Sequence, residues 1–155
     1  MTPAITLLQK KGVKHHVLKY EHDANASSYG LEAVEKLELD ASTVFKTLVV
    51  STDKGSLAVA IVPVNGKLSE KKMAKALGAK KVTMAPSDEV MASTGYVLGG
   101  VSPLGQKKRL STVIHESASS LPTIHVSAGK RGLEVSLSPT DLAAVTQASF
   151  ADIST

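Results

Sequence analysis

The sequence has no cysteine and no tryptophan, and only 3% of its 155 residues are aromatic. Without cysteine the chain forms no disulfide, holds no metal through a thiolate and has no cysteine nucleophile of its own. So few rings also argue against the stacked aromatic platforms that bind single-stranded nucleic acid. The core must therefore be built from aliphatic side chains.

Long apolar runs are missing as well. The opening Met1-Thr2-Pro3-Ala4-Ile5 lacks the basic region and apolar run of a signal peptide, and no stretch approaches the length of a membrane span. We therefore expect a cytoplasmic protein with no membrane contact. A length of 155 residues with 43% hydrophobic content predicts one globular domain over residues 1–155. The net charge of +4 is compatible with a polyanionic partner but is mild.

Capping residues and apolar spacing predict an α+β protein: a mixed, roughly seven-stranded, barrel-like sheet surrounded by about five short helices. Thr2 followed by Pro3 is a typical helix start, and Ser138-Pro139-Thr140-Asp141 repeats that pattern with an acid at the third helical position. The other helices are expected after Ser27 and Ser28, after Ser69 and after Ser87, and the strands over 13–20, 44–50, 56–64, 82–84, 110–115, 123–127 and 133–137.

One stretch, residues 95–105, combines four glycines with Ser102, Pro103 and apolar residues, and carries no charge. Glycine is favoured where the backbone takes a positive φ or approaches another group closely. Successive free N–H groups in such a turn can form a nest for an anion. A buried turn with a bulge explains the pattern equally well, so the stretch alone does not decide between the two.

A lysine, Lys46, lies inside the otherwise apolar strand Val44–Val50, which we expect to be buried on both faces. It either lies at the mouth of the strand and extends its ammonium to water, or it faces a pocket. Both interpretations stay open on the residues alone.

Catalysis by a protein nucleophile finds little support. None of the five histidines lies near a G-x-S-x-G serine, and Ser102 is followed by proline. His15 and His16 are adjacent on a strand and point to opposite faces, so they cannot chelate one metal together. The chemistry that is left is a metal-free pocket of backbone donors at Gly99 and Gly100, hydroxyls and one lysine, which can stabilise a developing oxyanion or simply bind a ligand.

Basic residues occur in four groups along the chain. A solvated basic face is the usual meaning of any one group, but four groups favour contact with a phosphate backbone. The last two groups follow glycine-rich turns and are expected to share one rim with the pocket. The groups are Lys71, Lys72 and Lys75; Lys80 and Lys81; Lys107, Lys108 and Arg109; and Lys130 and Arg131.

Three motifs taken together resemble the YbaK family of aminoacyl-tRNA deacylases, relatives of the editing domain inserted in bacterial prolyl-tRNA synthetases. They are the F-K-T-L at 45–48, the glycine stretch extended to Arg109, and V-S-A-G-K-R-G-L at 126–133. The segment 20–23 also matches, so the resemblance covers essentially the whole chain. It implies a mixed β-barrel with helices around it, and removal of cysteine from mischarged Cys-tRNA(Pro) without a metal or other cofactor.

The resemblance also implies site residues. Lys46 is the residue tied most closely to activity in that family. The mechanism implied is attack by the substrate's own thiol on its ester, which leaves a cyclic thiolactone. Where some relatives carry aspartate, this chain carries Glu134. The remaining implied substrate-binding residues are Tyr20, Thr47, Gly99, Gly100, Val101, Ser102 and Ser127, and the implied tRNA-binding residues are Lys107, Lys108, Arg109, Lys130 and Arg131.

Two other functions remain open on the sequence. In the first, the chain is a non-catalytic module of the same fold that binds tRNA or binds a synthetase. In the second, it is a deacylase for Ala-tRNA(Pro). Lys46 and the glycine pair favour an active enzyme, with tRNA and prolyl-tRNA synthetase as its expected partners.

Overall fold

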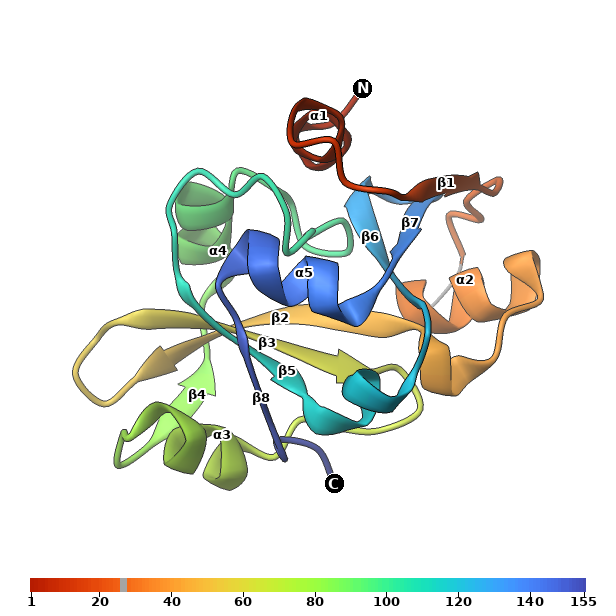
Figure 1. Cartoon of the computed structure of the whole chain (residues 1–155). Coiled ribbons are helices and arrows are strands. Elements are labelled where there is room, and N and C mark those ends of the chain that lie inside the picture. The colour runs from red at the N-terminus through yellow and green to blue at the C-terminus, as the bar shows by residue number, and fades with distance from the viewer. Residues whose placement is uncertain (26–27) are drawn as a thin grey trace.

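The computed structural model describes residues 1–25 and 28–155, and within them the chain forms five α-helices and eight strands in two sheets (Figure 1). The predicted mixed α+β architecture is confirmed. The barrel is not closed, because the two sheets are joined within the described residues only by an isolated bridge between Val44 and His125. The predicted Ser27 lies outside the described residues.

The smaller sheet has three antiparallel strands in the order β1 (His16–Lys19), β7 (Leu133–Leu137) and β6 (Ile124–Lys130). His16 of β1 pairs with Ser136 of β7, so a strand near the start of the chain is held by one near its end. The strand β6 runs on to Lys130, beyond the predicted end at residue 127. The turn is limited to Arg131 and Gly132.

The larger sheet has the order β4 (Val82–Met84), β2 (Phe45–Thr52), β3 (Leu57–Pro63), β5 (Ser111–His115) and β8 (Ser149–Ala151). The strands β2 and β3 form an antiparallel hairpin, while β5 and β8 add in parallel. The sequence did not predict β8, because this three-residue strand has no buried side chain that would give it an apolar pattern.

Side-chain caps explain four of the helix starts. Thr2, Ser28, Ser69 and Ser138 each accept a hydrogen bond from a backbone N–H in the first turn, as predicted. The prediction that Ser87 is a cap was wrong, because Pro86 holds that position and Ser87 is the first helical residue. The helices are α1 (Pro3–Lys10), α2 (Tyr29–Leu37), α3 (Glu70–Leu77), α4 (Ser87–Thr94) and α5 (Pro139–Thr146), with short 3-10 helices at Ala41–Thr43 and Glu116–Ser120.

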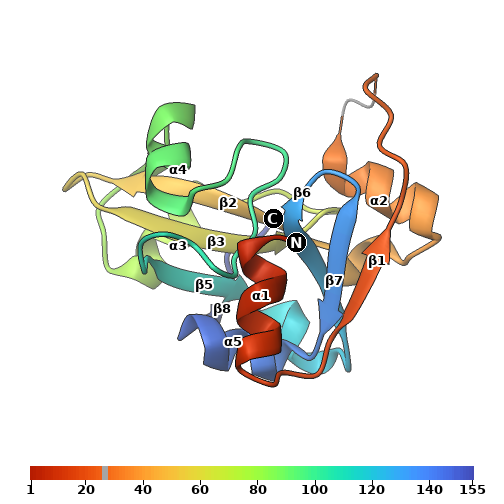
Figure 2. The ribbon, with the colours of Figure 1, turned by 90° about the horizontal axis from the view of Figure 1, so that it is seen from above.

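The larger sheet is covered on both faces. On one face α3 packs Met73 and Ala74 against Val62 and its neighbours. On the other face α1, α5 and the three-stranded sheet form the main core, in which Leu8, Phe45 and Leu142 are buried (Figures 1 and 2). The core is mostly aliphatic, as the composition predicts, with Phe45 and Tyr96 as its buried aromatic residues. No helix among residues 1–25 and 28–155 is long and apolar enough to cross a membrane.

Candidate functional site

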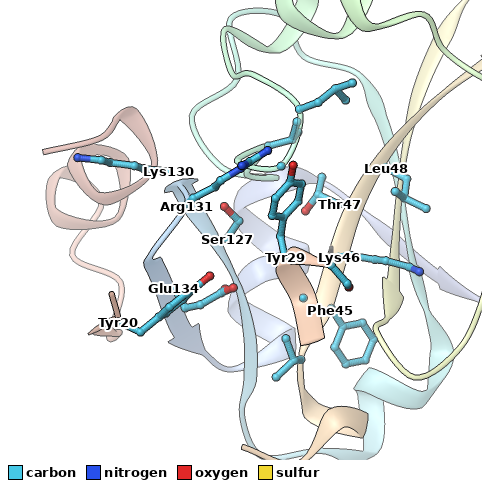
Figure 3. Close-up of a pocket in the computed structure, with 16 residues that line it drawn as sticks. Tyr20, Tyr29, Phe45, Lys46, Thr47, Leu48, Ser127, Lys130, Arg131 and Glu134 are labelled. Carbon is cyan, nitrogen blue, oxygen red and sulfur yellow. The ribbon is translucent and has the colours of Figure 1, made fainter. Parts of the chain in front are cut away.

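A cavity of about 310 Å³ lies between the β2 edge of the larger sheet and the β6–β7 hairpin of the smaller one (Figure 3). Segments that are far apart in the chain meet there: the end of β1, the start of α2, the first half of β2, the glycine stretch and the β6–β7 hairpin. The predicted site residues that line it are Tyr20, Lys46, Thr47, Gly99, Val101, Ser127, Lys130, Arg131 and Glu134. The predicted Gly100 and Ser102 are not among its lining residues.

The backbone of β2 is open along this cavity. Val44 O accepts from the N–H of Val64, just after β3, and the Thr52 N–H donates to the O of Ser56, just before it, so the backbone groups of the even-numbered residues between them face β3. The odd-numbered residues face the opposite edge, where Val49 accepts a hydrogen bond from the Ala85 N–H at 3.0 Å. The strand β4 pairs only from Val50 onward. The N–H and C=O of Thr47 therefore face the cavity.

Two neighbours on β2 contribute side chains to different faces. Thr47 points toward Ser127, whereas Lys46 runs away from Ser127 and Glu134 on the other side of the strand (Figure 3). The buried Oγ1 of Thr47 has no hydrogen-bond partner in the part of the chain that the structure describes. Burial, with a smaller contribution from Lys67, lowers the pKa of Lys46. Lys46 therefore forms the outer lip of the cavity, while Thr47 faces its interior.

Ser127 and Glu134 face each other directly across β6 and β7. Glu134 is only 6% exposed, and burial raises its pKa to about 8. Its Oε2 is buried and meets no hydrogen-bond partner among the described residues. Tyr20 lies beside it, held through its N–H, which donates to Gly132 O at 3.0 Å, and burial raises the pKa of its phenol as well. At neutral pH the Glu134 carboxyl is thus mostly protonated, and its Oε2 has unused hydrogen-bonding capacity toward the cavity.

The glycine stretch is a folded turn at the cavity wall. Gly100 donates its N–H to Val97 O at 3.0 Å, and Gly99 has a φ of +89°, the pattern of a type II turn. A Cβ at Gly99 would collide with the ring of Tyr29, and one at Gly100 would lie 3.3 Å from the Cα of Lys130. The two glycines therefore let the turn pack against its neighbours, and the N–H of Gly100 is already used.

Ser102 holds the same stretch from inside. It is fully buried, and its hydroxyl accepts a hydrogen bond from Leu104 N–H at 3.2 Å. Tyr96 donates its hydroxyl to Leu104 O at 2.6 Å, and burial raises the pKa of this phenol to about 12. Val101 follows the turn and lines the cavity. Of these two predicted substrate-binding residues, Val101 is thus at the cavity, whereas Ser102 supports the loop behind it.

A bulge in β6 directs the hairpin tip toward the cavity. Ser127 pairs with Glu134 and Lys130 pairs with Leu133, which leaves Ala128 and Gly129 without partners on β7. Gly129 donates its N–H to Ser127 Oγ at 3.1 Å. Its φ is +103°, and a Cβ there would lie 2.5 Å from the Tyr96 ring. The bulge thus requires glycine at 129 and places Lys130 and Arg131 at the edge of the cavity, with the Lys130 side chain pointing outward (Figure 3).

The predicted basic rim is divided between two places. Lys130 and Arg131 line the cavity, whereas Lys107, Lys108 and Arg109 line a second depression of about 310 Å³ between the glycine stretch and α5. Backbone N–H groups of Lys107 and Lys108 donate to the end of α4 at 3.1 and 2.9 Å, which fixes that group in place.

The sequence did not predict Tyr29, His22 or Glu32 at the site. Arg131 lies 3.6 Å over the Tyr29 ring, and its Nη1 is 3.2 Å from His22 Nε2. The rarity of tyrosine was an available signal. The chain has three tyrosines, of which Tyr20 and Tyr29 line the cavity and Tyr96 supports its loop.

The arrangement offers hydrogen-bonding groups rather than a nucleophile. Hydroxyls, a buried carboxyl, an open strand edge and cations at the mouth suit a polar ligand whose anionic part stays outside. No group of three or more His, Asp or Glu side chains within the described residues is placed to hold a metal ion.

Comparison with known proteins gives a consistent result. Residues 24–145 match the model of the aminoacyl-tRNA editing domain. The chain is 38% identical to EbsC of Enterococcus faecalis, named as a Cys-tRNA(Pro)/Cys-tRNA(Cys) deacylase, over 99% of this chain and 93% of that protein. It is also 32% identical to a proline–tRNA ligase of Trichlorobacter lovleyi over 68% of this chain but only 18% of the ligase. A crystal structure described as a trans-editing enzyme for prolyl tRNA synthetase has the same fold, with a TM-score of 0.83, 24% identity and coverage of 99% and 95%.

Proposed function

Because the chain belongs to the aminoacyl-tRNA editing domain family, we propose that it is a trans-editing deacylase that removes cysteine from mischarged Cys-tRNA(Pro). The near full-length similarity to EbsC supports this substrate, and the similarity to a proline–tRNA ligase supports prolyl-tRNA synthetase as a partner beside the tRNA. Residues 1–155 act as one editing domain, since α1 and α5 share a single core. The protein works in the cytoplasm, where its tRNA substrate is found.

The observation that carries the proposal is the unpaired polar lining of the cavity. Thr47 Oγ1 and Glu134 Oε2 are buried without hydrogen-bond partners among the residues described, which costs stability unless a ligand supplies the partners. An aminoacyl ester has complementary groups, an ammonium and a carbonyl. Glu134 binds the ammonium, whose positive charge favours loss of the carboxyl proton. The backbone N–H of Thr47, which faces the cavity, holds the carbonyl.

The tRNA end lies toward the cavity mouth. Lys46 at the outer lip contacts the terminal ribose or its phosphate, while Lys130 and Arg131 contact the tRNA backbone at the mouth. Ser127 and Tyr20 line the inner wall and fix the orientation of the aminoacyl group. In this arrangement every cation lies outside the aminoacyl subsite. The cations then face the tRNA phosphates, which carry the negative charge of the substrate.

The reaction needs no nucleophile from the chain. The cysteinyl sulfur of the substrate gives up its proton and attacks its own ester carbonyl carbon, forming a C–S bond. The bond from that carbon to the ribose oxygen breaks, and the oxygen takes up a proton as the tRNA leaves. The products are free tRNA and a cyclic thiolactone of cysteine. The chain's contribution is to hold the acyl group in the conformation that brings sulfur and carbon together.

The test uses the whole purified protein and measures its deacylation of tRNA that is charged with cysteine, alanine, serine or proline. We expect rapid release of cysteine alone. Faster release of alanine would instead assign an Ala-tRNA(Pro) deacylase. Binding of every tRNA with release of no amino acid would contradict an enzymatic function and leave a non-catalytic binding module.

A further inference from the structure

Arg131 is held in place more firmly than any other cation at the cavity. Its guanidinium stacks on Tyr29 at 3.6 Å, and its Nη1 lies 3.2 Å from His22 Nε2. A guanidinium has only donors, so His22 Nε2 must be the acceptor. The proton of the neutral imidazole is then on Nδ1, which donates to Glu32 Oε1 at 2.7 Å.

Glu32 determines which tautomer of His22 is present in this series of contacts. It is 6% exposed, and its Oε2 accepts from the Asp23 N–H at 2.7 Å and lies 3.3 Å from the Lys36 ammonium. Burial alone raises the pKa of Glu32, but the hydrogen bonds from Asp23, His22 and Lys36 outweigh it and hold the pKa below its usual value. The ionised carboxylate therefore selects the His22 tautomer that accepts from Arg131.

The guanidinium is held but not neutralised. None of the carboxylates in residues 1–25 and 28–155 forms an ion pair with Arg131, whereas the exposed Lys72 pairs with Asp152 at 2.9 Å. One face of the Arg131 guanidinium is covered by the Tyr29 ring and one of its N–H groups is bonded to His22, which leaves the other N–H donors of the planar group unused. The stack also lies against the turn at Gly99, where an added Cβ would be 2.7 Å from Arg131 Nε. A fixed, unpaired fork thus lies at the cavity mouth.

We propose that His22 and Glu32 are positioning residues that hold Arg131 on Tyr29 so that its free edge binds the phosphate of the substrate's terminal nucleotide. This rests on the proposed function, because that function brings a phosphodiester to the cavity mouth. Planar bidentate binding of phosphate is the use to which arginine is suited and lysine is not. Arg131 is then a specific phosphate ligand rather than one of several interchangeable rim cations.

The direct test compares binding of AMP and adenosine to the whole chain by NMR titration. The 5′-phosphate of AMP represents the phosphate of the terminal nucleotide. We expect AMP to bind about tenfold more tightly than adenosine, and this preference to vanish in both Arg131→Met and Arg131→Lys. The control Lys14→Met removes an exposed cation elsewhere and should keep the preference. An equal preference in wild type and Arg131→Met, or no binding of AMP, contradicts the phosphate site.

The positioning role is tested by a double-mutant cycle on the KM for Cys-tRNA(Pro). His22→Ala should raise KM about fivefold in the wild type and cause no further rise in Arg131→Met, because His22 acts through Arg131. A merely structural role would raise KM in both backgrounds. Glu32→Gln gives a second variant if His22→Ala unfolds, and His16→Ala is the exposed control. A wild type that cleaves no aminoacyl-tRNA overturns the proposed function, whereas an AMP result independent of Arg131 overturns only this inference.

Discussion

Lys46 and Thr47 are neighbours on β2, but their side chains lie on opposite sides of the strand (Figure 3). The lysine belongs to the outer lip and the threonine to the interior of the cavity. The proposed function therefore gives the two residues separable roles, Lys46 toward the tRNA end and Thr47 toward the aminoacyl group.

Lys46→Ala should lower the deacylation rate about a hundredfold or more, because the lost ammonium orients the terminal nucleotide. The free energy of unfolding should change by less than about 1 kcal/mol, since Lys46 makes no ion pair within the described residues and is only half-buried. Lys67→Ala removes a neighbouring exposed cation and serves as the control. Unchanged activity in Lys46→Ala with an unchanged circular dichroism spectrum would show that Lys46 only extends to water.

Thr47→Val should separate stability from activity. The valine replaces a buried hydroxyl that has no partner in the residues described, so the free energy of unfolding should rise by up to about 1 kcal/mol while deacylation slows. Thr112→Val is the matched control, because the Thr112 hydroxyl donates to Leu110 O at 3.0 Å and its loss should destabilise the protein. Urea denaturation measures the free energy of unfolding of both variants, and a deacylation assay measures their activity. A marked loss of stability in Thr47→Val would mean that its hydroxyl is already bonded.

Glu134 should make stability depend on pH in a defined window. Its pKa is raised from 4.5 to about 8 in the folded protein, so the folded state binds the extra proton between these values. Its contribution to stability is therefore full below about pH 4.5 and falls as pH rises toward 8, by at most about 1.4 kcal/mol per pH unit. Glu134→Gln mimics the protonated form and should lose this slope, while the exposed Glu35→Gln should keep it. Parallel slopes for wild type and Glu134→Gln in urea denaturation would disprove the raised pKa.

The two groups of rim cations should contribute to tRNA affinity without regard to sequence. Removing one phosphate contact should weaken binding of every tRNA and lower the slope of log affinity against log salt by about one. Lys130→Ala reports on the cavity mouth and Lys108→Ala on the second depression. Lys72→Ala is the control, because that ammonium is paired with Asp152. If one variant leaves the slope unchanged, the tRNA does not pass over that group.

The proposed nucleophile predicts a large difference between Cys-tRNA and Ser-tRNA. A few per cent of a thiol is ionised at neutral pH, whereas an alcohol is almost wholly protonated, so cysteine should be released far faster. The two side chains are nearly equal in size, and fit alone would separate them only by a modest factor. Single-turnover rates on the same tRNA measure this. Comparable rates would mean that water is the nucleophile and that no thiolactone forms.

The fold could be predicted from the sequence where local signals are strong. Caps such as Thr2 and Ser138 and the apolar runs on β2 and β3 locate their elements within a few residues. The short strand β8 has no such signal, and its position is set only by pairing with β5. The open barrel likewise depends on how two sheets meet, which no local pattern specifies.

The site shows the same limit. Motifs led to Lys46, Ser127 and Glu134, but not to the side of β2 on which Lys46 lies. His22 was missed because its contact with Arg131 joins residues that are far apart in the chain, and Glu32 was missed because it reaches Arg131 only through His22. Gly100 was expected to offer a free N–H, which the turn in fact uses internally.

The pairing of His16 with Ser136 has a consequence for how the site comes into being. Closing so long a loop costs chain entropy before any contact compensates for it, and the parallel pairing of β3 with β5 adds to that cost. We therefore expect folding over milliseconds to seconds rather than microseconds. The cavity forms only when segments from distant parts of the chain have come together. A nascent or partly folded chain consequently has no weakened version of the site, and activity should appear in a single step with the final assembly of the two sheets.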